Sequence, residues 1–287
     1  MCDMYPYFST FLFYLCFSVC LSRFAGARIG ASLDWMLPLV GHKTRLPCKD
    51  EELRTCLAGF AIQGNMDSRR RNYTLIWDQL DERLNASEDL RRDDRFKINV
   101  VGSGCPSKLE VPLRLEQRVR PHVNLRFDDF YDLIHHNFAL IPTLASESYF
   151  DRKVRGGGCP VTDMGLNHLC VWLTRALTFT TISPLQFSST VITSLATGVP
   201  IIVTKRFLES YTFLSKDSVW LQIDGEEAID AAIRLLHLPV DQLAALRNGI
   251  GQLRENLNQR AAGQIQEIID KSKDLPGAGP LPWTQPG

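Results

Sequence analysis

Two short polar segments of this 287-residue sequence carry side chains suited to binding a phosphorylated ligand. The first begins at Gly64, directly after the apolar run 57–63, and contains three arginines just ahead of a helical pattern. Cations at the start of a helix oppose its dipole, whereas a guanidinium group binds phosphate through paired hydrogen bonds. We therefore interpret Gly64, Arg70 and Arg71 as phosphate-binding residues, with a solvated basic turn as the alternative.

The second segment, Ser188-Ser189-Thr190, opens an expected helix that ends at Gly198-Val199-Pro200 before an apolar run. Hydroxyl side chains cap helix starts, and together with the free backbone N–H groups there they form an anion site. The pattern predicts that Ser188, Ser189 and Thr190 hold a diphosphate. A plain helix cap without a ligand is the alternative.

A nicotinamide cofactor has weaker support. Residues 100–104 resemble the start of a dinucleotide fingerprint, a strand followed by Gly-x-Gly. The third glycine is missing and Cys105-Pro106 follows, so no helix begins where the fingerprint requires one. An NAD(P)-binding Rossmann oxidoreductase is therefore a minor alternative.

The cysteines and acidic residues predict no metal site. None of the eight cysteines forms a Cys-x-x-Cys pair, and none stands at metal-ligand spacing from a histidine cluster, so we expect no metal and no cofactor. We interpret Cys48 and Cys56 as ordinary thiols, with a disulfide as the alternative in an oxidising compartment. Asp128 and Asp129 are expected to cap a short helix rather than to hold a cation.

The elements that must position these residues alternate along the chain. Strands are expected at 57–63, 96–101, 123–127, 138–143 and 200–204, and helices at 70–84, 128–136, 188–197, 226–236 and 240–271. This alternation predicts an α/β fold, a Rossmann-like doubly wound parallel sheet with helices on both faces. Ligands bind such sheets beyond the carboxyl ends of the strands, where both polar segments are expected to lie.

The chain is expected to divide into an apolar anchor or signal segment (1–28), a stem or linker (29–56), one domain (57–274) and a disordered tail (275–287). The N-terminal segment indicates a membrane or secretory-pathway location in the ER or Golgi. If it is instead a buried apolar segment, the location is cytoplasmic. The formal net charge is zero and the pI about 7.0, which argues against a nucleic-acid partner.

Three runs carry a family resemblance: LAGFAIQGNMDSRRRNYTLIWDQL, FALIPTLASESYFD and FSSTVITSLATGVPIIV. They resemble the C-terminal, donor-binding half of GT-B glycosyltransferases, in a family-1-like or family-4-like group from eukaryotes. The resemblance covers Leu57 to Lys271 and implies a single GT-B half. It further implies a UDP- or GDP-linked sugar as donor, transfer to an unknown acceptor, and no metal; it assigns no catalytic residue.

The sequence departs from that family in three ways. Thr193 stands where many retaining members carry a glutamate, so Thr193 and the upstream Glu147 are only possible sugar or ribose contacts; Glu147 is equally well a solvated loop charge. Residues 154–186 interrupt the resemblance, and we interpret them as a retained intron or an insertion. Little chain precedes residue 57 to form an acceptor domain. The alternative function is therefore an inactive or truncated donor-domain remnant that acts as a binding protein.

Overall fold

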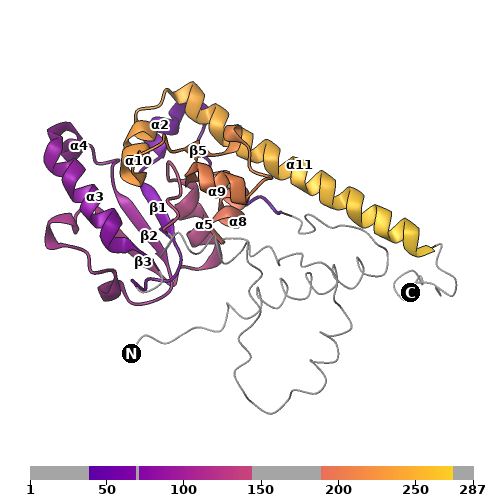
Figure 1. Ribbon diagram of the computed structural model, residues 1–287, viewed down its shortest axis with the longest axis horizontal. Helices are drawn as coiled ribbons and strands as arrows, with labels where there is room; N and C mark the ends of the chain where they lie inside the picture. The colour runs from indigo at the N-terminus through magenta and orange to yellow at the C-terminus, as the bar shows by residue number, and fades with distance from the viewer. Residues whose placement is uncertain (1–38, 69–70, 144–188, 274–287) are drawn as a thin grey trace, which may run out of the picture.

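The computed structural model describes residues 39–68, 71–143 and 189–273, and its centre is a parallel sheet. Strands β1 (Phe60–Gln63), β2 (Ile98–Gly102) and β3 (Val119–Val123) pair in parallel, as do β4 (Ile202–Val203) and β5 (Trp220–Leu221) (Figure 1). The prediction of an α/β fold with parallel strands is confirmed.

Leu140 joins the two groups of strands. It bridges Ala61 of β1 on one side and Ile201, next to β4, on the other, both in parallel. The backbone N–H groups of Ala61 and Ile202 donate to the carbonyls of Ala139 and Leu140, each at 2.9 Å. Counting the segment around Leu140 as the fourth strand, the order across the sheet is 3-2-1-4-5-6, that of doubly wound dinucleotide-binding folds.

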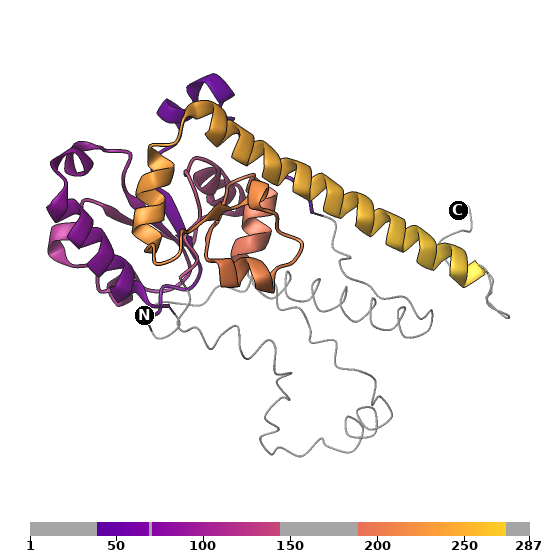
Figure 2. The same cartoon turned by 45° about the horizontal axis from the view of Figure 1, so that its top comes forward.

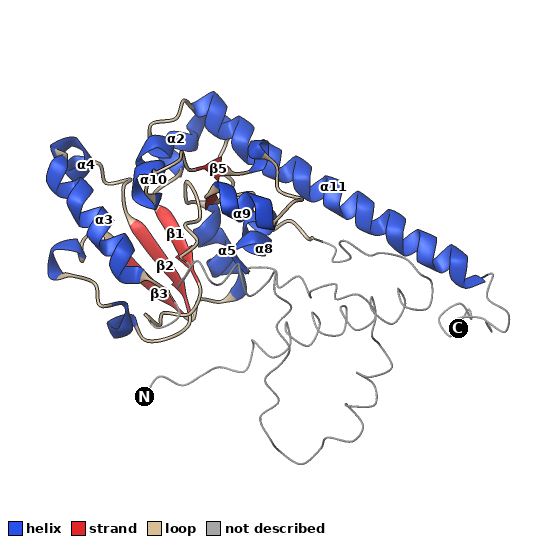
Figure 3. Cartoon of the chain, in the orientation of Figure 1, coloured by secondary structure: helices blue, strands red, loops and turns tan. Residues whose placement is uncertain are grey.

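Helices cover both faces of this sheet (Figures 1 and 3). The α-helices are α2 (Leu53–Cys56), α3 (Tyr73–Ala86), α4 (Glu88–Arg92), α5 (Phe127–His135), α8 (Ser189–Thr197), α9 (Lys205–Ser210), α10 (Ala228–Leu236) and α11 (Val240–Lys273). Short 3-10 helices are η1 (Asp50–Glu52), η2 (Pro106–Leu109), η3 (Leu113–Leu115) and η4 (Lys216–Ser218). Helix α11 crosses the molecule, and its C-terminal end projects beyond the sheet (Figure 2).

Successive residues of the strands belong alternately to two hydrophobic clusters. Ile62 and Val100 pack with α3 and α10 on one face, while Ala61, Val101 and Leu140 pack with α5, α8 and α11 on the other. Such alternation follows from the two-residue repeat of a strand. We call these the α3 face and the α5 face.

Helix α3 shows how the sequence builds one of these layers. Its apolar residues recur at helical spacing and are buried: Tyr73, Ile76, Trp77, Leu80 and Leu84. The Asn72 side chain accepts a hydrogen bond from the Leu75 N–H (3.1 Å), so the helix begins after Asn72 rather than at the expected residue 70. The buried Trp77 indole donates to the Leu109 carbonyl (2.8 Å) and fixes η2 against the helix.

A buried polar network crosses the α5 face. Asn99 of β2 donates through Nδ2 to Asn137 Oδ1 (2.7 Å), and Asn137 donates to the Leu133 carbonyl (2.6 Å). The Asn99 Oδ1 accepts from His122 Nε2 of β3 (3.2 Å). Asn99 and Asn137 are only 3% and 0% exposed, and these bonds offset the cost of burying their amides.

Some expected boundaries are wrong. The third strand is Val119–Val123 rather than 123–127, because Arg120 and Pro121 are exposed on the edge of the sheet and hide the apolar pattern. The run 138–143 contributes a bridge at Leu140 instead of a full strand. Helix α9 and strand β5 were not predicted.

The part of the expected stem that the structure describes packs on the domain. The Leu39 backbone exchanges two hydrogen bonds with the Asn258 amide of α11 (2.7 and 2.9 Å), and the His42 N–H donates to the Ala196 carbonyl (2.8 Å). Leu53 is buried in the core on the α3 face. The apolar segment 1–28, the interruption 154–186 and the tail 275–287 lie outside the described residues. In the described ranges, no helix has the length and apolar character needed to cross a membrane.

Candidate functional site

The strand order defines a topological switch point at the carboxyl edge of the sheet, which we call the crevice. From β1 the chain passes through α3 to β2, and from the Leu140 strand it passes toward β4 on the other side. Connections that leave neighbouring strands in opposite directions open a crevice between them, where ligands of doubly wound sheets bind. In this chain the crevice lies between the residues after β1 and those after Leu140.

Gly64 ends β1 at this crevice. Its φ of 133° lies in a region that side chains rarely adopt, and a Cβ there would overlap the Arg71 guanidinium. A Cβ on Gly102, at the end of β2, would overlap the Gly64 carbonyl oxygen. Glycine at both positions therefore allows two backbones and one guanidinium group to pack closely together.

Arg71 spans the crevice. Its Nη1 donates to Thr143 Oγ1 (3.1 Å) and lies 3.4 Å from the Thr143 carbonyl oxygen. Thr143 follows the Leu140 strand and is 5% exposed. A cationic group is thus held between the two strands at which the order reverses, one residue before the Asn72 cap of α3.

Tyr73 holds the loop that follows Gly64 in place. Its hydroxyl donates to the Asn65 carbonyl (3.2 Å), and its ring stacks on Trp77. Burial raises the pKa of the Tyr73 phenol, an effect that the nearby Arg71 charge opposes. The phenol is therefore neutral at physiological pH and acts as a donor to the loop.

Helix α8 begins at the same edge. Residues 201–203 continue from α8 and run parallel to the Leu140 strand, so α8 runs antiparallel to the strands and its N-terminus lies at their carboxyl ends. Ser189 is exposed there, and Thr190 is 2% exposed. The backbone N–H groups and positive dipole end of a helix N-terminus suit an anion.

Thr193, one turn further along, lies in the packed interior. It is 2% exposed and hydrogen-bonded to Tyr131 of α5, and its carbonyl accepts from the Thr197 hydroxyl (2.7 Å). Helix α8 itself carries no acidic residue. The carboxylate that the family resemblance led us to look for is absent from this helix.

The structure therefore brings Gly64 and Arg71 into contact and places Ser189 and Thr190 at the same edge of the sheet. Arg70, Ser188 and Glu147 lie outside the described residues. Sequence reasoning missed Thr143. Its signal was available, because it is the first polar residue after the apolar run that ends at Pro142.

Comparison with known proteins yields similar structures only. No protein-family model matches the sequence, and no curated protein sequence matches it. The UDP-forming α,α-trehalose-phosphate synthase of Burkholderia vietnamiensis aligns with a TM-score of 0.45 at 9% identity, over 77% of this chain and 47% of that one. HepE of Anabaena, solved in complex with UDP-glucose, gives 0.44 at 12% identity, over 82% and 56%. The N-terminal domain of Candida albicans trehalose-6-phosphate phosphatase gives 0.42 at 10% identity, over 77% and 43%.

The matched structures include GT-B glycosyltransferases. This chain spans about half the length of the structures it matches.

The Gly-x-Gly of residues 102–104 lies beside the Gly64 loop, because Gly102 packs on the Gly64 carbonyl and Gly104 bridges Met66. It follows β2 rather than β1, and it leads into the 3-10 helix η2 instead of an α-helix. In a dinucleotide-binding fold the fingerprint follows the first strand, at the point where the order reverses. This placement disfavours the oxidoreductase alternative.

The expectation that Asp128 and Asp129 cap a helix is wrong. The N-cap of α5 is Arg126, which makes no side-chain cap, and both aspartates lie in the first turn. Asp129 pairs with Arg45 (2.5 Å) and Arg126 (3.0 Å), and these arginines lower the pKa of its carboxyl group. The ion pair between Asp129 and Arg45 fixes residue 45 onto α5.

The interpretation of Cys48 and Cys56 as free thiols is also wrong, because the two form a disulfide with Cα atoms 5.7 Å apart. The fold also brings one ligand atom of His136 within 4.8 Å of both sulfur atoms, which spacing along the sequence did not predict. The His136 ring nitrogens lie 2.6 and 2.9 Å from the Asp132 and Leu46 carbonyls. The ring thus ties the segment 46–56 to the end of α5.

Proposed function

We propose that this chain binds a nucleotide sugar at the carboxyl edge of its sheet and serves as the donor half of a glycosyltransferase. The observation that carries the proposal is the Arg71 guanidinium, which packs on Gly64 and bonds Thr143 across the point where the strand order reverses. A guanidinium, a close-packed glycine and two helix N-termini at one edge match what a diphosphate requires. The proposed donors are UDP- and GDP-linked sugars, and the acceptor is unknown.

The proposed chemistry is stabilisation of the leaving group. When the bond between the sugar and the diphosphate breaks, negative charge develops on the diphosphate oxygens. Arg71, the Thr190 hydroxyl and the N-terminus of α8 would neutralise that charge, because fixed donors stabilise developing charge without reorganisation. Arg70, Ser188 and Glu147 are proposed to add contacts to phosphate and sugar. Since these groups supply the neutralisation, we propose that transfer uses no metal.

A second candidate is a protein that binds the donor without transferring it. Thr193 is buried beneath Tyr131 where the family resemblance led us to look for a carboxylate, and α8 offers no acidic replacement. This arrangement favours binding over turnover. The two candidates share a ligand and differ in whether the sugar is released.

The test compares the full chain with a variant lacking residues 154–186. Calorimetric titration with UDP and GDP measures donor binding, and incubation with several UDP- and GDP-sugars measures sugar release. Binding with release supports a transferase, whereas binding without release supports the second candidate. Binding by the shortened variant alone supports the intron interpretation. If neither form binds either nucleotide, the proposal fails.

We also propose a secretory-pathway location with membrane association. The Cys48–Cys56 disulfide supports an oxidising compartment, because disulfides are rare where glutathione keeps thiols reduced. Protease protection of the tagged chain in intact microsomes would test it. A chain fully digested without detergent would contradict the proposed location.

A further inference from the structure

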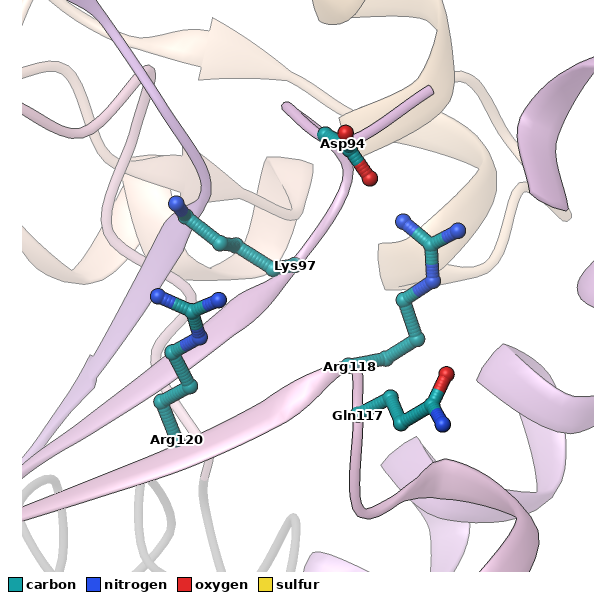
Figure 4. Close-up of a pocket in the computed structure, with 5 residues that line it drawn as sticks. All are labelled: Asp94, Lys97, Gln117, Arg118 and Arg120. Atoms are coloured by element: carbon teal, nitrogen blue, oxygen red, sulfur yellow. The ribbon is translucent and has the colours of Figure 1, made fainter. Parts of the chain in front are cut away.

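A basic cavity lies at the opposite, amino edge of the sheet. It has a volume of about 370 Å³ and is lined by Asp94, Lys97, Gln117, Arg118 and Arg120 (Figure 4). Lys97 directly precedes β2, and Gln117 and Arg118 precede β3. Gly102, at the other end of β2, is five residue steps from Lys97, which corresponds to about 16 Å along a strand. This cavity is therefore distinct from the crevice at Gly64.

The register of β2 and β3 gathers the cations. Asn99 pairs with Arg120, and Lys97 stands two residues before Asn99 on the same side of its strand. Arg118 stands two residues before Arg120. Figure 4 shows the ends of the Lys97 and Arg120 side chains converging on one side of the β2 segment, whereas the Arg118 side chain points to the other side. Because β3 is the edge strand, Arg120 stays exposed and the cavity stays open to solvent.

Among the described residues, no ion pair balances the charge of this cavity. Three cations and one carboxylate line it, so its net charge is +2. In the described part of the chain, none of Lys97, Arg118 and Arg120 forms an ion pair with a carboxylate within 4.0 Å. Asp94, the one acidic group of the lining, interacts with Lys97 only through its field.

Arg118 is held in place by backbone groups. Its Nη1 donates to the carbonyls of Asp93 (2.8 Å) and Phe96 (3.2 Å), and its Nη2 donates to the Arg91 carbonyl. These bonds leave the guanidinium charge uncompensated. They fix a positive group at the cavity wall at no further cost in side-chain entropy when a ligand enters.

Burial and the neighbouring positive charges together lower the pKa of two groups near this cavity. Burial lowers the pKa of Lys97, and Arg120 lowers it further, while Asp94 acts in the opposite sense. Burial, Arg120 and Lys97 also lower the pKa of His122, which lies two residues beyond Arg120 on β3. Like charges held this close are unfavourable unless an anion lies between them.

We propose that this cavity binds a phosphate monoester or inorganic phosphate at Lys97 and Arg120, with the fixed Arg118 charge at the opposite wall. Guanidinium and ammonium groups are the usual partners of phosphate oxygens, and the Gln117 amide adds a neutral donor. The volume lies at the small end of ligand pockets, about 300–1,000 Å³, so the ligand is a small molecule or a headgroup. A polynucleotide is disfavoured, because the chain as a whole has no net positive charge.

The test is calorimetric titration of inorganic phosphate into the full chain and into Lys97→Gln and Arg120→Gln. Each substitution is expected to raise the Kd for phosphate at least about tenfold, the factor for one lost charge-assisted hydrogen bond. Lys216→Gln removes an exposed lysine of η4, which does not line the cavity, and should leave the Kd unchanged. Phosphate should also raise the pKa of His122, measured from its imidazole NMR signals in the wild-type chain.

The Arg71→Gln variant distinguishes phosphate binding at the donor crevice from phosphate binding at the amino-edge cavity. Phosphate binding that is lost in Arg71→Gln but kept in Lys97→Gln and Arg120→Gln would place the ion at the donor crevice and overturn the inference. Binding lost only in the latter two supports it, whether or not any nucleotide binds. Without phosphate at low salt, Lys97→Gln should melt at an equal or higher temperature than wild type, since a repulsion is removed. A clear fall would contradict the charge argument.

The source of the phosphate group is distinguished by vesicles. Flotation with phosphatidic acid in phosphatidylcholine vesicles that is lost in Lys97→Gln and competed by excess free phosphate would identify a lipid headgroup in this cavity. Phosphate binding without flotation would identify a soluble ligand. If the full chain binds neither inorganic phosphate nor these vesicles, the proposed site is refuted.

Discussion

Replacement of Arg71 by glutamine tests the donor site most directly. The substitution keeps a polar side chain, shorter than arginine, and removes the charge that contacts Thr143. A hydrogen bond from a charged group contributes about 1.5–3 kcal/mol. At about 1.4 kcal/mol per factor of ten, loss of one such bond to a diphosphate predicts a Kd for UDP about tenfold to a hundredfold higher.

The measurement is titration calorimetry with UDP, repeated for Arg71→Lys and Thr143→Val. The lysine variant retains the charge but not the planar pair of donors, so a smaller loss of affinity is expected. Thr143→Val removes the hydroxyl that orients Arg71 and leaves the charge, which predicts a loss of only a few-fold. All three should unfold within a few degrees of wild type, since each removes at most about 1 kcal/mol of native hydrogen bonding. If Arg71→Gln binds UDP within twofold of a wild type that itself binds, Arg71 does not contact the phosphates.

Three further predictions address the fold around the site. Measured by urea titration, Gly64→Ala should lower the free energy of unfolding by about 1–3 kcal/mol, because a φ of 133° is strained with a side chain and Arg71 must move. As a control, Gly251→Ala in α11 should raise the free energy of unfolding by about 0.5–1 kcal/mol, because an added Cβ there meets nothing within 4 Å. The double variant Cys48→Ser, Cys56→Ser should have a free energy of unfolding lower by about 2.5 kcal/mol, because the disulfide restricts the unfolded chain across an eight-residue separation. Equal free energies of unfolding for the oxidised wild type and the variant would show that the bond does not form. Burial and the Arg247 charge lower the pKa of His135 to about 4, against about 6.5 when unfolded. The unfolded chain therefore binds more protons than the folded chain between these two pH values. The contribution of His135 to the free energy of unfolding is full above pH 6.5 and falls toward pH 4 by at most about 1.4 kcal/mol per pH unit. His135→Asn should remove that part of the pH dependence, and an unchanged dependence would show that another group titrates.

The sequence predicted the layers well because their signals are local. The apolar spacing of α3 and the run before Gly64 each lie within one element, so element type could be read directly. Strand β3 was misplaced because an edge strand exposes Arg120 and Pro121, and its polar residues break the alternation. Strand β5 is two residues long and leaves almost no pattern to detect.

The candidate site could be predicted only in part for a related reason. Gly64 and Arg71 share one loop, and a glycine followed by arginines is visible in the sequence. The contact between Arg71 and Thr143 joins residues 72 positions apart and depends on the strand order. The amino-edge cavity depends on the register of β2 against β3, which places Lys97 and Arg120 together. Patterns along the chain do not specify such pairings.

The buried amide of Asn99 bears on how faithfully the sheet assembles. Shifting β2 by one residue would turn Asn99 toward the apolar α3 face and strip it of Asn137 and His122, its partners at 2.7 and 3.2 Å. Each buried amide left without a partner costs about 1–3 kcal/mol, so misaligned forms would be sparsely populated and would revert. A leucine at this position would remove that discrimination and let slipped sheets persist as kinetic traps. In the native chain, the same amide that excludes slipped sheets also keeps Lys97 and Arg120 facing one opening.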